Sequence, residues 1–331
     1  MALYLTESDV RQILTMPMAI DLVETSFRRL AAGTATNHSR LRLQVPGKTI
    51  LNYMAAADSE GGYLGLKIYS IARGAARFIV PLISAETGDM AALIEADYLG
   101  QVRTGAASGV ATKFMARPDA RTAAIIGTGS QARTQLEAIA CVRKLSRVRA
   151  YSRDPQRRER FAREMSARIG VAVEAVATAE EAVRGADVIS TATTAASPVV
   201  EGRWIEPGAH INAIGINVAH KREIDAEAVN RADVIAADSP EQSRLESGDL
   251  IAAFGDNASK WSEVREIAQV VAGRIPGRTS PDQITLFKSN GIAIEDVVTA
   301  ARVYELARQR GIGREVPVWR DDARAAEGRT V

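Results

Sequence analysis

AAIIGTGSQA, at Ala123–Ala132, is the stretch that decides the fold of this 331-residue chain. Four apolar residues lead into a glycine-rich turn, and a helical pattern follows it. This order is typical of a strand, a tight turn and a helix that together hold the phosphates of a dinucleotide. The turn itself consists of Gly127, Thr128, Gly129, Ser130, Gln131 and Ala132.

Each small residue of the turn has a physical reason. Gly127 ends the predicted strand, and Gly129 allows the backbone to approach a pyrophosphate. Ala132 takes the place of the third glycine, where a small side chain permits close packing of helix on strand. A helix that starts near Gln131 directs its amide donors and its positive end at the phosphates. The alternative is a strand-to-helix turn that binds no ligand.

Short apolar strands alternate with amphipathic helices after residue 118. This alternation predicts a doubly wound parallel sheet, so we expect an α/β protein with a Rossmann dinucleotide-binding domain over 119–299. The predicted strands are TAAIIG, RVRAYS, VAVEAV, ADVISTAT, HINAIG and ADVIAADS.

Residues 1–118 have a different texture. A helical pattern over 7–31 precedes strand-like segments that alternate polar and apolar residues, with an ETGD turn at Glu86–Asp89. A further helix, YLGQVRTGAASGVATKFMA, ends this part. The helix that leads into 300–331 is expected to pack back on 1–118, which gives a discontinuous α+β domain for substrate binding and dimerisation.

The residues that follow the second predicted strand bear on the cofactor. Ser152 lies 25 residues beyond Gly127, close to where an acidic residue binds the ribose in NAD-preferring proteins. A hydroxyl at Ser152 and a cation at Arg153 suit the 2′-phosphate of NADP(H) instead. NADP(H) is therefore the expected cofactor, with NAD(H) possible. The alternative is that Arg153 is an ordinary surface base.

Composition excludes several classes of protein. The chain has 42 basic and 40 acidic residues, so no charge excess points to nucleic acid. One cysteine, Cys141, excludes an intrachain disulfide framework, and no apolar run is long enough to span a membrane. The three histidines lack metal-ligand spacing. We expect a cytoplasmic protein without a metal site.

Five motifs resemble the ornithine cyclodeaminase/mu-crystallin family. The likeness extends over almost the whole chain, and it implies a homodimer with a small imino or amino acid as substrate. It also implies chemistry at an imine next to a carboxylate, with hydride given or taken by a nicotinamide. The motifs are GLKIYS, ETGDMAALIEADYLGQVRTGAASGVAT, AAIIGTGSQA, HINAIGIN with HKREID, and LFKSNGIAIEDV.

The resemblance implies that Arg103, Lys67 and Arg40 bind the substrate carboxylate. Arg103 is expected at a strand-to-helix junction, and its planar fork suits a bidentate contact. Lys67 interrupts an apolar strand, where a cation is costly unless it is paired, and it could instead protonate the imine nitrogen. Arg42 lies on the same strand face as Arg40 and could take its role.

Four further residues match family positions on the cofactor side, and a capping or turn role is the alternative for each. Thr104 neighbours Arg103, and Thr193 ends a predicted parallel strand, at the edge where ligands bind in such sheets. Lys221 and Ser289 match positions near the pyrophosphate and the nicotinamide.

Two departures from the family pattern favour one branch of its chemistry. The cyclodeaminase has an aspartate where this chain has Asn217, and a glutamate near the distal amine where it has Asn52. An amide orients a ligand but cannot act as a base near neutral pH. We therefore expect imine or ketimine reduction, or an amino-acid dehydrogenase activity. Ornithine cyclodeamination and a non-catalytic NADPH-binding, crystallin-like role are the alternatives.

Overall fold

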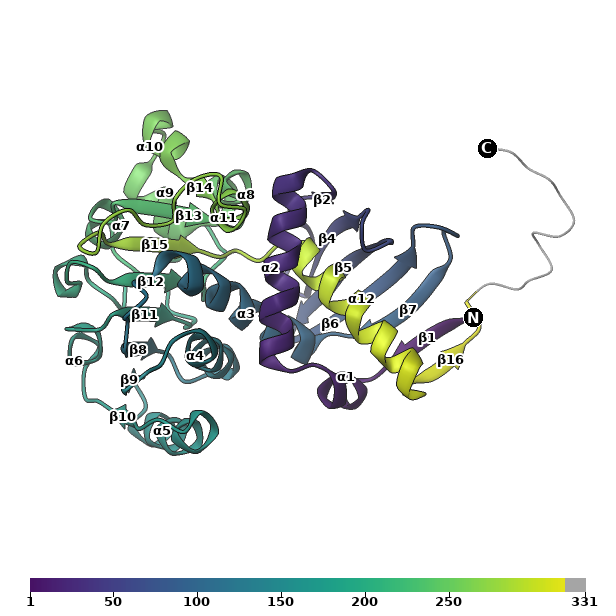
Figure 1. Ribbon diagram of the computed structural model, residues 1–331, viewed down its shortest axis with the longest axis horizontal. Helices are drawn as coiled ribbons and strands as arrows, with labels where there is room; N and C mark the ends of the chain where they lie inside the picture. Colours follow the sequence, from purple (N-terminus) through teal and green to yellow (C-terminus); the bar gives the residue numbers. More distant parts are fainter. Residues whose placement is uncertain (319–331) are drawn as a thin grey trace, which may run out of the picture.

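The computed structural model describes residues 1–318 and places two eight-stranded sheets side by side (Figure 1). One sheet is formed by the N-terminal part of the chain with one strand from its C-terminal part, and the other by the middle of the chain (Figure 1). The long helix α3 (Asp97–Met115) lies between them.

The second sheet is parallel throughout, in the order β10-β9-β8-β11-β12-β15-β13-β14. The chain reverses its direction of sheet growth between β8 and β11, which confirms the doubly wound Rossmann arrangement. Its strands are β8 (Thr122–Ile126), β9 (Arg147–Tyr151), β10 (Val173–Ala175), β11 (Val188–Thr191), β12 (His210–Ala213), β13 (Val234–Ala237), β14 (Arg265–Glu266) and β15 (Thr285–Lys288).

Helices connect these strands because each apolar strand, buried on both faces, needs cover on both sides. They are α4 (Ser130–Val142), α5 (Pro155–Ile169), α6 (Ala179–Val183), α7 (Ala226–Asn230), α8 (Pro240–Glu246), α9 (Gly248–Phe254), α10 (Ala258–Glu263) and α11 (Ile267–Val271).

The first sheet is mainly antiparallel, in the order β16-β1-β7-β6-β5-β4-β2, with β3 paired to β4. Only β1 and β7 pair in parallel. Its strands are β1 (Ala2–Leu5), β2 (Ala35–Asn37), β3 (Leu41–Val45), β4 (Thr49–Asp58), β5 (Tyr63–Ala72), β6 (Ala75–Ser84), β7 (Met90–Glu95) and β16 (Arg314–Val316). The expected ETGD turn connects β6 to β7.

The single helix expected over 7–31 is wrong. The segment forms α1 (Glu7–Ile13) and α2 (Met16–Ala32), separated at Leu14 and Thr15. Pro17 explains the break, because a proline has no N–H to continue the hydrogen bonds of α1 and is tolerated only in the first turn of a new helix.

Helix α12 (Ala293–Arg310) follows β15 and packs on α2, β4 and β5 of the first sheet (Figure 1). Its side chains enter the same apolar core as those of α2 and α3. We therefore propose that the division between the domains lies before Ala293, earlier than residue 300. Residues 319–331 of the predicted C-terminal segment lie outside the described residues.

Candidate active site

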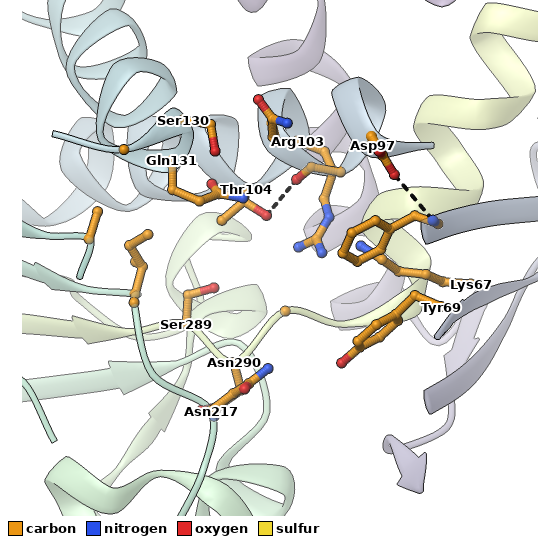
Figure 2. Close-up of a pocket in the computed structure, with 18 of the residues that line it drawn as sticks. Lys67, Tyr69, Asp97, Arg103, Thr104, Ser130, Gln131, Asn217, Ser289 and Asn290 are labelled. Carbon is orange, nitrogen blue, oxygen red and sulfur yellow. Dashed lines mark hydrogen bonds between the residues drawn. The ribbon is translucent and has the colours of Figure 1, made fainter. Parts of the chain in front are cut away.

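A cavity of about 470 Å³ lies between the two sheets. One wall comes from β5 and β6, a second from α3, and the opposite side from the start of α4 and the loops after β11, β12 and β15 (Figure 2). The carboxyl ends of the parallel strands thus face the N-terminal sheet, at the place where such sheets bind ligands. The predicted residues on the wall are Arg40, Lys67, Arg103, Thr104, Gly129, Ser130, Gln131, Thr193, Asn217 and Ser289.

The glycine-rich turn has the geometry that a bound dinucleotide requires. Gly127 has φ +111°, and a Cβ there would lie 2.3 Å from the Ala192 carbonyl oxygen, so only glycine fits. A Cβ on Gly129 would meet no protein atom within 4 Å, because that position faces open space. Gly129 is also the N-cap of α4 and has no side chain to accept from the first-turn amides. These residues fit a pyrophosphate at the helix N-terminus.

A buried carboxylate organises the two loops opposite this turn. Glu223 accepts hydrogen bonds from the Thr193 amide at 2.6 Å, the Gly215 amide at 2.7 Å and the Thr191 hydroxyl at 3.0 Å. Its burial raises the pKa of the carboxyl. Glu223 therefore fixes Thr193 at the cavity wall, although it does not line the cavity itself.

A second buried carboxylate holds the loop after β15. Asp238 accepts from the Ser289 hydroxyl at 3.0 Å and from the amides of Asn290 at 2.8 Å and Gly291 at 2.6 Å. The loop lies close to Arg103, since a Cβ on Gly291 would approach Arg103 Nη1 to 2.9 Å. Asp238 thus places the Ser289 loop against the cationic end of the cavity.

Lys67 and Arg103 form one buried cluster with two acidic residues of α12. Lys67 Nζ donates to Asp296 Oδ1 at 2.9 Å, and Arg103 Nε donates to the same oxygen at 3.0 Å. Arg103 Nη1 donates to Glu295 Oε2 at 2.7 Å. Lys67 is 3% exposed and Arg103 5%, so both cations meet the requirement that a buried charge be paired. Both point into the cavity (Figure 2).

Burial and charge shift the protonation of this cluster. Desolvation, together with the Arg103 charge, lowers the pKa of Lys67 to about 8, against the opposing effect of Asp296. Desolvation raises the pKa of Glu295 to about 8, although Arg103 opposes it. Lys67 can therefore give up a proton close to neutral pH, as a general acid must.

The expectation that Arg103 lies at a strand-to-helix junction is wrong. Helix α3 begins at Asp97, and Arg103 lies in its second turn. Arg103 still reaches the cavity beside Lys67, because the buried face of α3 is directed at the cavity.

Arg40 and Arg42 both bind Glu246 of α8, which lies in the other domain. Arg40 Nη1 pairs with one carboxylate oxygen, and Arg42 Nη2 lies 2.7 Å from the other. Arg40 Nη2 also donates to the Asn290 carbonyl at 2.7 Å. Arg40 lines the cavity while Arg42 does not, but both terminal nitrogens of Arg40 are already used by protein acceptors.

The remaining predicted residues lie apart from the cavity wall. Asn52 is buried and accepts from Arg42 Nε at 3.2 Å, and Arg42 also binds the Asn217 carbonyl at 2.8 Å. Ser152 and Arg153 follow β9 at the surface, and Lys221 does not line the cavity. Of the turn residues, Gly127, Thr128 and Ala132 also lie outside the wall.

Several residues of the site were not predicted from the sequence. Glu295 and Asp296 form an acidic pair inside the apolar run GIAIEDVVTA, a signal that could have identified them as partners of buried cations. Tyr69 and Phe78 stack at 4.8 Å between ring centroids and cover the Lys67 end of the cavity. They looked like ordinary alternating strand residues.

Two features are absent from residues 1–318. No group of three histidine, cysteine or acidic side chains there is arranged to hold a metal ion. No helix in that part combines the length and apolar character needed to cross a bilayer.

Comparison with known proteins agrees with this geometry. The Δ1-pyrroline-2-carboxylate reductase of Thermococcus litoralis, solved with NADH and L-proline, superimposes with a TM-score of 0.91 at 37% identity, over 95% of this chain and 100% of that one. The alanine dehydrogenase of Archaeoglobus fulgidus is 34% identical over 96% of this chain and 99% of its own length. The ketimine reductase mu-crystallin of Rattus norvegicus is 34% identical over 76% of this chain and 78% of its own length.

The family model that describes the ornithine cyclodeaminase/mu-crystallin family matches residues 2–311. This range includes every strand of both sheets except β16, together with the glycine-rich turn and the cationic end of the cavity. The chain therefore belongs to the ornithine cyclodeaminase/mu-crystallin family.

Proposed function

We propose that this protein is an NAD(P)H-dependent oxidoreductase that reduces a C=N bond next to a carboxylate. The observation that supports it most directly is the arrangement of the cavity, with the glycine-rich turn at one end and the Lys67–Arg103 cluster at the other. A substrate between them contacts a cofactor bound at the turn on one side and the two cations on the other.

The protein groups have separate tasks in such a reaction. Arg103 uses Nε and Nη1 on Asp296 and Glu295, which leaves Nη2 for the substrate carboxylate. Lys67 uses one of its three donors on Asp296, and the others are available to the imine nitrogen. The nicotinamide supplies the hydride when it is bound. Tyr69 and Phe78 exclude water from this end.

Relatives support this class of reaction. The Δ1-pyrroline-2-carboxylate reductase and the ketimine reductase mu-crystallin are named for imine reduction. Alanine dehydrogenase is named for the oxidation of an amino acid, which passes through an imine in the reverse sense. In this chain Asn217 and Asn52 provide amides where cyclodeamination needs a base and an acidic partner for a second ammonium group, so we favour the reductase.

We propose NADP(H) as the cofactor, because Ser152 and Arg153 stand where NAD-preferring proteins have an acidic residue. Arg153 is exposed, and among residues 1–318 it forms no ion pair or side-chain hydrogen bond, so its charge is free to meet a 2′-phosphate.

We also propose a homodimer. Exposed apolar side chains lie together on the first sheet, and an exposed apolar patch of this kind is typical of a protein–protein interface. They are Leu41, Leu43 and Val45 of β3, Leu51 of β4, Leu64 of β5 and Ile79 of β6. A related archaeal alanine dehydrogenase, solved with NAD, is described as a dimer.

The test is oxidation of NADPH and NADH by the purified protein with a panel of substrates. The panel contains cyclic ketimine carboxylates and 2-oxo acids with ammonia or methylamine, and ornithine with NAD is measured beside it. Turnover of an imine supports the proposal. Formation of proline from ornithine without imine reduction contradicts it, and tight NADPH binding without any turnover favours the non-catalytic alternative.

A further inference from the structure

The carboxylate of Asp296 accepts hydrogen bonds from both cations of the cluster. Both Lys67 Nζ, at 2.9 Å, and Arg103 Nε, at 3.0 Å, donate to its single oxygen Oδ1. The side chain is fully buried, and its other oxygen, Oδ2, has no hydrogen-bond partner among the described residues. Asp296 does not line the cavity, so it acts on a ligand only through the two cations.

We propose that Asp296 is a positioning residue that holds the Lys67 ammonium and the Arg103 guanidinium side by side, so that one meets the imine nitrogen and the other the substrate carboxylate. This inference rests on the proposed imine reduction for the roles of the two cations. The contacts of both cations with Asp296 Oδ1 do not depend on which substrate binds.

Packing leaves Lys67 few other positions. A Cβ on Gly100 would lie 3.2 Å from Nζ, and the ring centroid of Phe78 lies 5.4 Å away. Asp296 on α12 is thus the acceptor that draws the ammonium to one place in this enclosed space. Without it, a buried amine has only the cavity itself in which to find a partner.

The charges that face Lys67 come from three elements. They are Asp296 and Glu295 of α12, Arg103 and Asp97 of α3, and Arg40 in the segment before β3. Burial, Arg103 and Arg40 all lower the pKa of Lys67, and Asp296 raises it. Replacing Asp296 by asparagine preserves the shape of the side chain and removes the charge that favours the ammonium form.

Two measurements on Asp296→Asn test the proposal. In the first, the seven lysines are labelled with ¹³C at Cε and titrated by NMR, with Lys67 assigned from the spectrum of Lys67→Arg. In the second, kcat/KM for imine reduction is measured against pH. Lys67 donates its proton only as the ammonium, so activity falls as pH rises through its pKa.

We expect both the Lys67 titration and this falling limb to move to lower pH in Asp296→Asn. At pH 8, kcat/KM should fall about 100-fold, which is the size of a lost general acid. Pyrrole-2-carboxylate, a stable carboxylate probe, should bind about 10-fold more weakly because a neutral amide oxygen holds Arg103 Nε less strongly than a charged carboxylate does.

Asp249→Asn is the matched control. Asp249 forms another fully buried pair with a lysine, Lys288, at 2.7 Å. It should lower the melting temperature without moving the Lys67 titration or the falling limb. If Asp296→Asn does not fold, Asp296→Ser provides the same readouts with a smaller neutral side chain.

The outcomes separate this inference from the proposed function. An unchanged Lys67 titration in folded Asp296→Asn or Asp296→Ser overturns the positioning role, whatever the substrate. Failure of every imine in the panel contradicts the proposed function, whereas the NMR titration and the probe affinity still decide the role of Asp296.

Discussion

Two glycines of the same turn should respond to alanine in opposite ways. Gly127 and Gly129 are two residues apart, yet Gly127 faces protein and Gly129 faces open space. Gly127→Ala should therefore cost stability, while Gly129→Ala should cost cofactor affinity. The motif already assigns the pyrophosphate to Gly129, and the structure adds the close protein contact at Gly127.

The magnitudes follow from the geometry. At Gly127, φ is +111° and a Cβ would lie 2.3 Å from the Ala192 carbonyl oxygen. Left-handed backbone costs an alanine about 1–2 kcal/mol, and overpacking adds about 1–3 kcal/mol. Since each kcal/mol lowers the melting temperature of a protein of 150–250 residues by roughly 2–4 °C, we expect a fall of about 4–20 °C at most.

At Gly129 the backbone has φ −79°, which alanine adopts without strain, and a Cβ meets no protein atom within 4 Å. The free energy of unfolding should therefore change by less than about 1 kcal/mol. The new methyl group instead lies where the pyrophosphate would approach the α4 amides. Losing one charge-assisted hydrogen bond, worth about 1.5–3 kcal/mol, weakens binding roughly 10- to 100-fold.

Differential scanning fluorimetry gives the melting temperatures, and quenching of protein fluorescence by NADPH gives the affinities. The reasoning is refuted if Gly129→Ala binds NADPH as tightly as the wild type, because the turn then does not face the phosphates. A wild-type melting temperature for Gly127→Ala would show that the contact with Ala192 relaxes at no cost.

Three further predictions are independent of that turn. Arg153→Glu should reduce the ratio of kcat/KM for NADPH to that for NADH by about 10-fold or more, since the cation at the 2′-phosphate is reversed; an unchanged ratio in steady-state kinetics would rule Arg153 out. Burial lowers the pKa of His210 to about 3, so below pH 6.5 this histidine binds a proton in the unfolded chain and stays neutral in the folded one. Stability should thus decline as pH falls from about 6.5, and urea unfolding at pH 4–7 should show a flatter profile for His210→Gln. Leu43→Asp should convert the proposed dimer to a monomer in sedimentation velocity, and an unaltered mass would place the interface elsewhere.

Local patterns were enough to predict the parallel sheet and its binding edge. Continuous apolar strands that alternate with helices have few other arrangements, and the turn at Gly127 requires glycine through its own backbone. The split between α1 and α2 was missed although its cause, Pro17, is just as local. The helical spacing of apolar residues continues across the break and conceals it.

Partners of buried charges could not be predicted in the same way. The sequence shows that Lys67 needs a counter-charge, because its strand is otherwise apolar. It cannot show which one, since Asp296 lies 229 residues away and reaches Lys67 only when α12 returns to the first sheet. Arg40 and Glu246 are 206 residues apart and meet across the two domains for the same reason.

The charge balance of the completed site restricts its ligand. Burial raises the pKa of Glu295 and so favours its protonated form. When Glu295 is protonated, Lys67 and Arg103 have one negative partner, Asp296, and the cluster retains one positive charge. A ligand carboxylate neutralises that charge. Among the lining residues Asp97 supplies a carboxylate, which accepts from the Phe78 amide at 3.1 Å, and Asn217 supplies an amide. The electrostatics of the cluster thus favour a ligand with a carboxylate at this end of the cavity, and they do so without reference to the shape of the substrate side chain.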